Sequence, residues 1–229
     1  MVIPAQAGIG TNNIGFNLRF YRHSLALILA LILAACATQP IAPPPSTPAS
    51  TNATINQQHL AELANIKAFT LKGRLGVVTQ KQGFSGNIEW QHQANINNQA
   101  GTDNIDVYSP VGGKVANIAK TSNGVTLTDQ KGRSISAQDA ESLTEMTLGF
   151  RLPLTGLSDW ALGKPTISKV AASSWDEKGR LLTLKQDGWD ISYENYVENN
   201  GIELPNKIVL KSEKVNLKLL IENWKSITK

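Results

Sequence analysis

The chain has 229 residues, of which 22 are Lys or Arg and 18 are Asp or Glu, and its formal net charge is +4. This length is enough for one domain with a substantial core. The basic excess is small and no block of lysine and arginine occurs, which argues against nucleic acid as a partner.

The first 35 residues have the features of a secretory signal. Arg19 and Arg22 precede the apolar run LALILALILA at residues 25–34, and small residues follow it. An apolar segment of this length is too short to span a bilayer of ~30 Å as a helix. We therefore expect export and removal of residues 1–35, which leaves 20 basic and 18 acidic residues and a formal charge of +2.

Cys36 is the only cysteine, which excludes an intramolecular disulfide, and it ends the sequence LAAC. This arrangement resembles the lipobox of bacterial lipoproteins, which implies diacylation of the sulfur, cleavage before the cysteine and N-acylation. Each buried methylene contributes ~0.8 kcal/mol, so two or three acyl chains hold a protein on a membrane. An ordinary cysteine near a cleavage site is the alternative.

The two residues after the cysteine are Ala37 and Thr38. In lipoproteins generally, an Asp at the second mature position retains the product in the inner membrane. Its absence from this position therefore implies the outer membrane of a Gram-negative bacterium.

Residues 37–58, ATQPIAPPPSTPASTNATINQQ, are rich in Pro, Thr, Ser and Ala and lack aromatic residues. This composition predicts a flexible linker, so that residues 36–58 comprise the lipidated cysteine and its tether. The folded domain is expected over residues 59–229. Within it, HLAELANIKAF at residues 59–69 has an approximate helical stripe of apolar positions, which predicts a short opening helix.

From Phe69 onward the apolar period changes to two. In FTLKGRLGVVT, alternate positions from Phe69 to Val77 are apolar or Gly, and FSGNIEW repeats the pattern up to Trp90. Such alternation predicts half-buried antiparallel strands. Further strands are predicted at DNIDVY, KVANIAKT, GVTLTD and GRSISA, then at residues 167–174, 180–186 and 189–196, and finally at NKIVLKS and VNLKLLIENW.

Residues 137–163 interrupt the strands with AQDAESLTEMTLGF and PLTGLSDWALG, two segments that predict short helices. The whole pattern gives about eleven strands of a meander with one helical insertion, and the lack of a regular strand–helix alternation excludes a parallel α/β fold. A barrel of more than about eight strands begins to enclose a cavity unless something fills it. The helical insertion is the obvious cover, although periodicity alone favours a dry core that these residues complete.

No catalytic or cofactor motif stands out in the sequence. After cleavage the only histidines are His59 and His92, and neither has a second His or a Cys at metal-ligand spacing. The sequence lacks nucleophile-elbow, phosphate-loop, dinucleotide and zinc-protease motifs. Neighbouring carboxylates such as Asp103 with Asp106 fit a solvated face better than acid–base catalysis. We therefore expect neither enzyme activity nor a cofactor.

The order of motifs resembles the LolB family, the outer-membrane lipoprotein receptors of the lipoprotein-localisation pathway. The matching segments are GRLGVV, GFSGNIEWQ, YSPVGG, GVTLTDQKGRSISAQDAESL and LPLTGLSDWALGKP, which follow the lipobox and linker in the family's order. The resemblance implies a mainly β fold, a half-closed antiparallel β-barrel of about eleven strands with a helical lid and an apolar cavity for acyl chains. The candidate cavity residues are Leu75, Val77, Phe84, Ile88, Trp90, Val107, Ile118, Leu143, Met146, Leu157 and Trp160.

The resemblance also gives a role to the turn in DVYSPVGGKV. Pro110 and Gly112 suit a tight turn, but turn chemistry does not explain the apolar Val111 at the tip. In the family, a loop at this place carries a protruding apolar residue, a leucine, that helps to transfer lipoprotein into the membrane. Pro110, Val111 and Gly112 therefore form the candidate membrane-insertion loop. An incidental apolar turn residue is the alternative.

The function implied by the resemblance is a hand-over without covalent chemistry. The periplasmic carrier LolA would deliver lipidated cargo proteins, the cavity would bind their acyl chains, and the loop would pass them to outer-membrane phospholipid. We expect a monomer anchored on the periplasmic face of the outer membrane. Two alternatives differ in their ligand: a lipocalin-like lipoprotein would bind a free lipophile, and a structural lipoprotein with a filled barrel would bind no acyl chain.

Overall fold

The computed structural model describes residues 49–97, 99–149, 151–152 and 154–229. Contacts unite Thr47–Lys229 as one compact unit. The predicted signal peptide, Cys36 and the first part of the predicted linker lie outside the described residues. A chain that begins at residue 37 therefore contains the whole compact unit.

The described residues form eleven strands and three helices, as the bounds of the elements show. The helices are α2 (Ala49–Ala64), α3 (Ala140–Leu148) and α4 (Leu154–Ala161). The strands are β1 (Ala68–Thr79), β2 (Gly83–Gln93), β3 (Thr102–Tyr108), β4 (Lys114–Thr121), β5 (Gly124–Asp129), β6 (Ser134–Ala137), β7 (Val170–Trp175), β8 (Leu181–Gln186), β9 (Trp189–Asn199), β10 (Ile202–Lys211) and β11 (Val215–Thr228). The prediction of about eleven strands interrupted by two short helices is confirmed.

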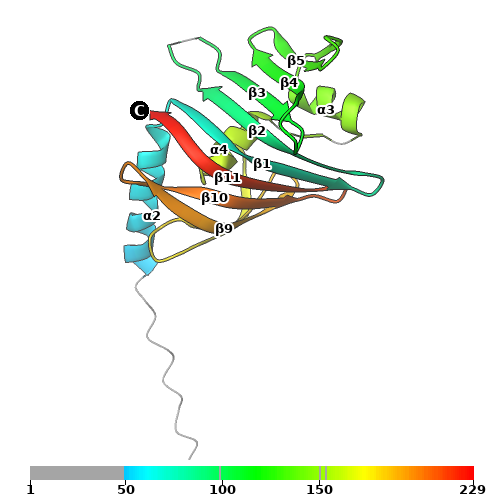
Figure 1. The fold of residues 1–229 in the computed structure, drawn as a ribbon. Helices are drawn as coiled ribbons and strands as arrows, with labels where there is room; N and C mark the ends of the chain where they lie inside the picture. The colour runs from blue at the N-terminus through cyan, green and yellow to red at the C-terminus, as the bar shows by residue number, and fades with distance from the viewer. Residues whose placement is uncertain (1–48, 98, 150, 153) are drawn as a thin grey trace, which may run out of the picture. The chain divides into compact units, whose positions relative to one another are not determined.

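All strands belong to one antiparallel sheet in the order β6-β5-β4-β3-β2-β1-β11-β10-β9-β8-β7. The first and last strands, β1 and β11, pair in the middle of the sheet, so β6 and β7 form its two edges. The sheet is curved but not closed, which confirms the predicted half-closed barrel (Figure 1). Because α3 and α4 lie in the segment that joins the two edge strands, they cross the concave side of the sheet.

The antiparallel order places alternate turns at opposite ends of the sheet. We call one end the rim, which comprises the turns 80–82, 109–113, 130–133, 187–188 and 212–214 and the connection 162–169 from α4 to β7. The other end, the base, comprises the turns 94–101, 122–123, 176–180 and 200–201 and helix α2. Figure 1 shows α2 at one end of the strands and the β1–β2 hairpin at the other.

Alternation along the strands builds the core on the concave side. Cross-strand pairing joins Ile105, Trp90, Leu71 and Trp224 in one row over four adjacent strands, and all four side chains are buried. The ring of Phe69 packs edge-to-face against Trp90 at 5.2 Å and against Trp224 at 5.4 Å between ring centroids. This aromatic cluster anchors the middle of the sheet near the base.

Helix α2 begins ten residues before the predicted opening helix and ends five residues before its predicted end, so residues 49–58 are not the coil that we expected. Ser, Thr and Asn in this segment have low helix propensity. Packing compensates for this: His59 and Leu63, one turn apart, are buried. The backbone of Asn56 also lies so close to Gly179 that a Cβ on Gly179 would come within 2.8 Å of it. Tertiary contact therefore stabilises a helix that the local sequence predicts only from residue 59 onward.

One carboxylate, Asp103, is buried on the concave face near the base. It accepts a hydrogen bond from Trp90 Nε1 at 2.9 Å, lies 2.7 Å from His92 Nδ1 and is 3.3 Å from Lys120 Nζ. Burial disfavours the ionised carboxylate, but the hydrogen bonds from His92 and Trp90 and the charge of Lys120 outweigh it, so the pKa of Asp103 is lowered. The group is therefore ionised in the folded protein at neutral pH.

We expect Asp103→Ala to lower the free energy of unfolding by about 2–4 kcal/mol, because Trp90 Nε1 would lose its buried acceptor and Lys120 its counter-charge. The contribution is present above the ordinary Asp pKa of 3.8 and is lost as the pH falls through the lower folded-state pKa. Urea unfolding at about pH 7 and about pH 3 should therefore show a smaller difference between wild type and variant at the lower pH.

The control for this prediction is Asp190→Ala, which removes only an exposed ion pair with Lys185. Exposed pairs contribute little, so this variant should unfold at the wild-type midpoint. If Asp103→Ala also unfolded there, the buried cluster would not stabilise the sheet.

Candidate functional site

The eleven predicted cavity residues all lie in the described unit, but they fall into two groups. Five are buried in the packed core, namely Ile88, Trp90, Val107, Leu143 and Trp160. The other six keep part of their surface accessible, namely Leu75, Val77, Phe84, Ile118, Met146 and Leu157. The second group could meet a ligand without rearrangement of the core, whereas the first supports the site from beneath. The role of either group in acyl-chain binding stays a prediction.

Three of the accessible apolar residues, Leu75, Val77 and Phe84, lie on the concave face on the rim side of the core. Ile118 pairs with Ile105 in the row near the base, and Met146 and Leu157 belong to α3 and α4. Val77 and Phe84 are cross-strand partners in the β1–β2 hairpin, on the same face as buried Leu71 and Trp90. Phe84 is 45% exposed, which is unusual for a phenylalanine on the inward side of a sheet. The hairpin therefore extends an apolar surface beyond the part of the sheet that the core covers.

Helix α3 provides one side of the cover. Asp139 caps its first turn by accepting a hydrogen bond from Ser142 N at 2.6 Å, and Gly149 ends it with a left-handed φ of 80°. Between these caps, Leu143 points into the core while Met146, three residues later, is 62% exposed. A flexible, polarizable methionine at such a place can adapt to apolar ligands of varied shape.

Helix α4 is fastened to the opposite half of the sheet. Trp160 Nε1 donates to Gln186 Oε1 at 3.0 Å, and Tyr193 Oη donates to the carbonyl oxygen of Trp160 at 3.0 Å. Burial raises the pKa of Tyr193 well above its usual range, so the hydroxyl remains protonated and can donate. The two helices thus approach the opening from the two sides of the half-barrel.

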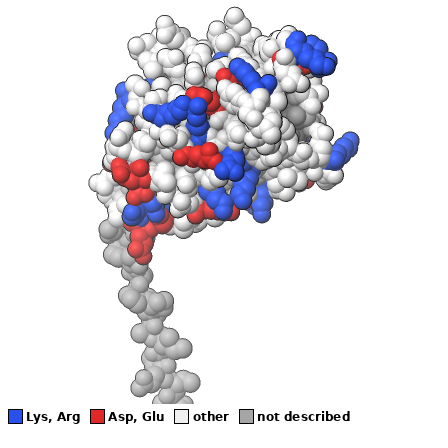
Figure 2. Space-filling model, in the orientation of Figure 1, with Lys and Arg blue, Asp and Glu red and all other residues white. Residues whose placement is uncertain are grey.

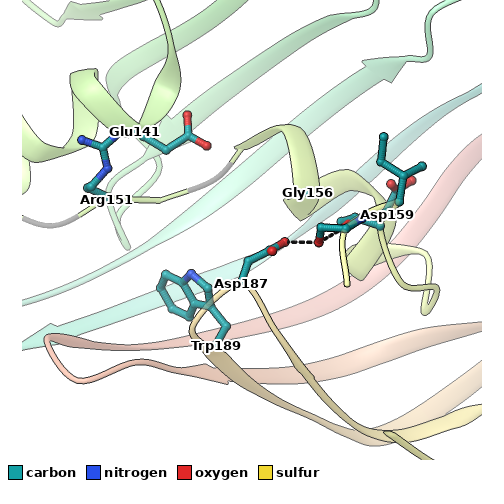
Figure 3. A pocket seen from close by; sticks show the side chains of 9 residues that line it. Glu141, Arg151, Gly156, Asp159, Asp187 and Trp189 are labelled. Carbon is teal, nitrogen blue, oxygen red and sulfur yellow. Dashed lines mark hydrogen bonds between the residues drawn. The ribbon is translucent and has the colours of Figure 1, made fainter. Parts of the chain in front are cut away.

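A pocket of about 590 Å³ opens beside these helices at the rim. Its lining combines α3, α4, the connection to β7 and the β8–β9 turn, with the residues Glu141, Arg151, Gly156, Asp159, Thr166, Ile167, Ser168, Asp187 and Trp189. Figure 3 shows Glu141 and Arg151 on one side of the pocket and Asp187 and Trp189 on another. None of these nine residues was predicted as a site residue, because they come from segments that only the fold brings together.

The predicted insertion loop is a closed turn at the rim. Ser109 N donates to the carbonyl oxygen of Gly113 at 2.7 Å, and Gly112, with a φ of 97°, donates to the carbonyl oxygen of Ser109 at 2.9 Å. Val111 stands at the tip and is 95% exposed. The backbone therefore fixes an apolar side chain in solvent, as insertion would require, and the insertion itself stays a prediction.

The convex face of the sheet differs in chemistry from the concave face. Ion pairs join neighbouring strands there, such as Lys72 with Glu89 at 2.9 Å and Arg74 with Glu222 at 2.7 Å. Figure 2 shows acidic and basic side chains interspersed over one face of the molecule. Interspersed charges of this kind keep a surface solvated.

The residues that the structure describes contain no group of three His, Cys, Asp or Glu side chains that could hold a metal ion. No helix in that part of the chain combines the length and the apolar character needed to cross a bilayer.

The sheet, the helices and the rim together define the class of fold. It is a half-barrel with accessible apolar side chains on its concave face and with helices across its opening. The model of the family described as "Outer membrane lipoprotein LolB" matches residues 67–224. The chain therefore belongs to the LolB family of outer-membrane lipoproteins, which act in lipoprotein localisation.

Individual relatives agree with this membership. The outer-membrane lipoprotein LolB of Nitrosomonas europaea is 35% identical over 174 residues, which cover 75% of this chain and 79% of the relative. The outer-membrane lipoprotein LolB of Thiobacillus denitrificans is 35% identical over 160 residues, which cover 69% of this chain and 81% of the relative. That of Pseudomonas paraeruginosa is 29% identical over 166 residues, which cover 72% of this chain and 78% of the relative.

Among solved structures, a LolA superfamily protein from Nitrosomonas europaea aligns with a TM-score of 0.47 at 9% identity, over 74% of this chain and 92% of its own. A DUF1329 family protein from Desulfovibrio piger aligns with a TM-score of 0.48 at 6% identity, over 78% and 92%.

Proposed function

We propose that this protein accepts lipoproteins from the periplasmic carrier LolA by binding their acyl chains on the concave face, and then releases them into the outer membrane. The observation that supports this most is the set of accessible apolar side chains on that face, between the packed core and the rim. In a soluble monomer with a filled barrel, such residues would be covered. The helices across the opening supply a cover that a bound chain could displace.

The hand-over requires no covalent step and no nucleotide. Acyl chains would leave one apolar surface for another, so the direction is set by the difference between the affinities of the two proteins for the same cargo. Release then depends on the bilayer, which offers a larger apolar volume than either protein. The exposed side chain of Val111 at the rim would make the contact with lipid.

The anchor is part of the same proposal. Residues 1–35 are removed as a signal peptide, Cys36 carries the acyl groups, and the segment from residue 37 joins the anchor to α2. This protein would then meet cargo on the periplasmic face of the outer membrane, which is where its release takes place.

The test of the binding site is Phe84→Glu in the chain that begins at residue 37. We expect its affinity for a fluorescent acyl probe to fall at least about tenfold, because the charge would lie on the surface that the acyl chain has to cover. The measurement is a fluorescence titration of the probe.

The matched control is Val78→Glu, because Val78 lies in the same hairpin on the opposite face of the sheet and is also exposed. It should bind the probe as the wild type does. Equal losses in both variants would show that the charge, and not the concave face, weakens binding. If the wild type bound no probe, a structural lipoprotein would be the better description. If the wild type bound the probe but cargo delivered by LolA did not compete with it, a carrier of free lipophiles would be favoured.

A further inference from the structure

The connection from α4 to β7 presents a second apolar side chain at the rim. Ile167 is fully exposed, although it is a large β-branched residue in the middle of the sequence KPTISK. The sequence pattern predicted a strand from residue 167, in which this side chain would have a neighbour. The strand instead begins at Val170, so Ile167 stands free of the sheet.

Hydrogen bonds on both sides of Ile167 hold it in this exposed place. Gln186 accepts from Thr166 N at 3.0 Å and donates from Nε2 to the carbonyl oxygen of Ser168 at 2.8 Å. Ser168 Oγ donates to Asp187 Oδ2 at 2.7 Å. These hydrogen bonds fix the backbone on both sides of Ile167, so its side chain is exposed because of an ordered backbone and not because the loop is loosely held. The same holds for Val111.

Other exposed apolar residues gather at the same end of the molecule. Val111, Val78 and Phe84 lie in or beside two other rim turns. Val78 and Phe84 flank the turn 80–82, Val111 is in the turn 109–113, and Ile167 is in the connection 162–169, so the apolar side chains come from three separate segments of the rim. Apolar side chains on separate turns can each insert into a lipid surface, whereas a folded protein partner would need a continuous complementary surface.

The charge of the rim is also distinctive. Its turns and the connection 162–169 carry six basic and two acidic residues, whereas the turns of the base carry two of each. Four exposed rim lysines have no ion-pair partner among the described residues, namely Lys81, Lys131, Lys169 and Lys214. The acidic residues are Asp187, which accepts from Ser168, and Glu213. Unpaired lysines around apolar tips favour an anionic lipid surface.

We propose that Ile167 is a second lipid-inserting residue and that the rim, through Ile167, Val111 and its lysines, docks on an anionic phospholipid surface. The membrane-facing role of the Val111 loop belongs to the proposed function above. Docking itself involves neither carrier nor cargo, so it is measured separately from cargo transfer.

The chain from residue 37 contains no cysteine, so a single label can be placed at will. Ile167→Cys carrying an environment-sensitive fluorophore should gain intensity and shift to the blue with vesicles of phosphatidylethanolamine and phosphatidylglycerol. The control is Leu182→Cys, since Leu182 is an exposed apolar residue of β8 next to the base. Its label should not respond. A silent label at position 167, or equal responses at both positions, would overturn the proposal.

A second measurement avoids the label. Co-flotation of Ile167→Ser with the same vesicles should be reduced about tenfold relative to wild type and to Leu182→Ser. Lys169→Glu should weaken flotation with these vesicles but not with phosphatidylcholine, and added salt should diminish the difference. Unchanged flotation of Ile167→Ser would refute insertion. If the label at position 167 responded to LolA loaded with cargo but not to vesicles, this surface would dock a protein and the lipid proposal would be wrong. If the label responded to vesicles but cargo transfer failed, lipid docking would stand and the receptor function would be rejected.

Discussion

Val111→Glu is expected to accept cargo normally and to release it into liposomes at least about tenfold more slowly than the wild type. Burying a valine side chain contributes ~1.5–3 kcal/mol, which corresponds to a factor of ten or more. The variant loses this contribution, and the carboxylate that replaces it is repelled by anionic lipid. Acceptance should be unaffected because the turn from Ser109 to Gly113 closes on itself and Val111 packs against nothing in the core.

A fluorescent lipoprotein allows the two steps to be followed in one experiment, first from LolA to the soluble chain and then to liposomes. Val111→Leu is the informative partner, because a larger apolar side chain at the same tip should release cargo as fast as valine or faster. If Val111→Glu released cargo at the wild-type rate, the loop would be an incidental turn, and release would have to take place elsewhere on the molecule.

Gly73→Ala is expected to destabilise the domain by about 3 kcal/mol or more. Gly73 lies on β1 where the register with β11 shifts, and a Cβ at this position would come within 2.2 Å of the carbonyl oxygen of Leu220. That atom belongs to the backbone of the paired strand, so the clash can be relieved only by separating the two central strands. Chemical denaturation of the chain from residue 37 gives the free energy directly.

The matched substitution is Gly76→Ala on the same strand. A Cβ at Gly76 would lie 4.0 Å from the carbonyl oxygen of Lys218, which is an ordinary contact. Its effect should remain within about 1 kcal/mol of the wild type. Similar losses in both variants would mean that the cost reflects alanine in the strand and not the close approach of β1 and β11.

Much of the sheet is predictable because alternation along a strand is a local signal. The pattern from Phe69 to Trp90 predicts two strands, and the structure pairs them as β1 and β2. The start of β10 at Ile202 was missed, although Asn200 and Gly201 both have a positive φ and form the Asn-Gly hairpin signal that precedes it. The opening helix was predicted from residue 59, but residues 49–58 of α2 were missed because their Ser, Thr and Asn have low helix propensity.

The candidate site is predictable only in part, because the sequence tells which residues are apolar and not how deeply each one is covered. Trp90 and Phe84 belong to the same alternating pattern, yet one is buried and the other is 45% exposed. Trp90 packs against Phe69 in the core near the base, whereas Phe84 lies beside the rim turn 80–82. Ile167 and Asp187 at the rim likewise gain their positions from hydrogen bonds between segments that are distant in the sequence.

The most direct test of the account is the transfer of a labelled lipoprotein from LolA to the chain that begins at residue 37, without membrane and without nucleotide, followed by size-exclusion chromatography. If the concave face is an acyl-chain site of higher affinity than that of the carrier, the label will move from the LolA fraction to the fraction of this protein. If the label remains with LolA at every ratio of the two proteins, the half-barrel does not receive lipoproteins and the central claim fails.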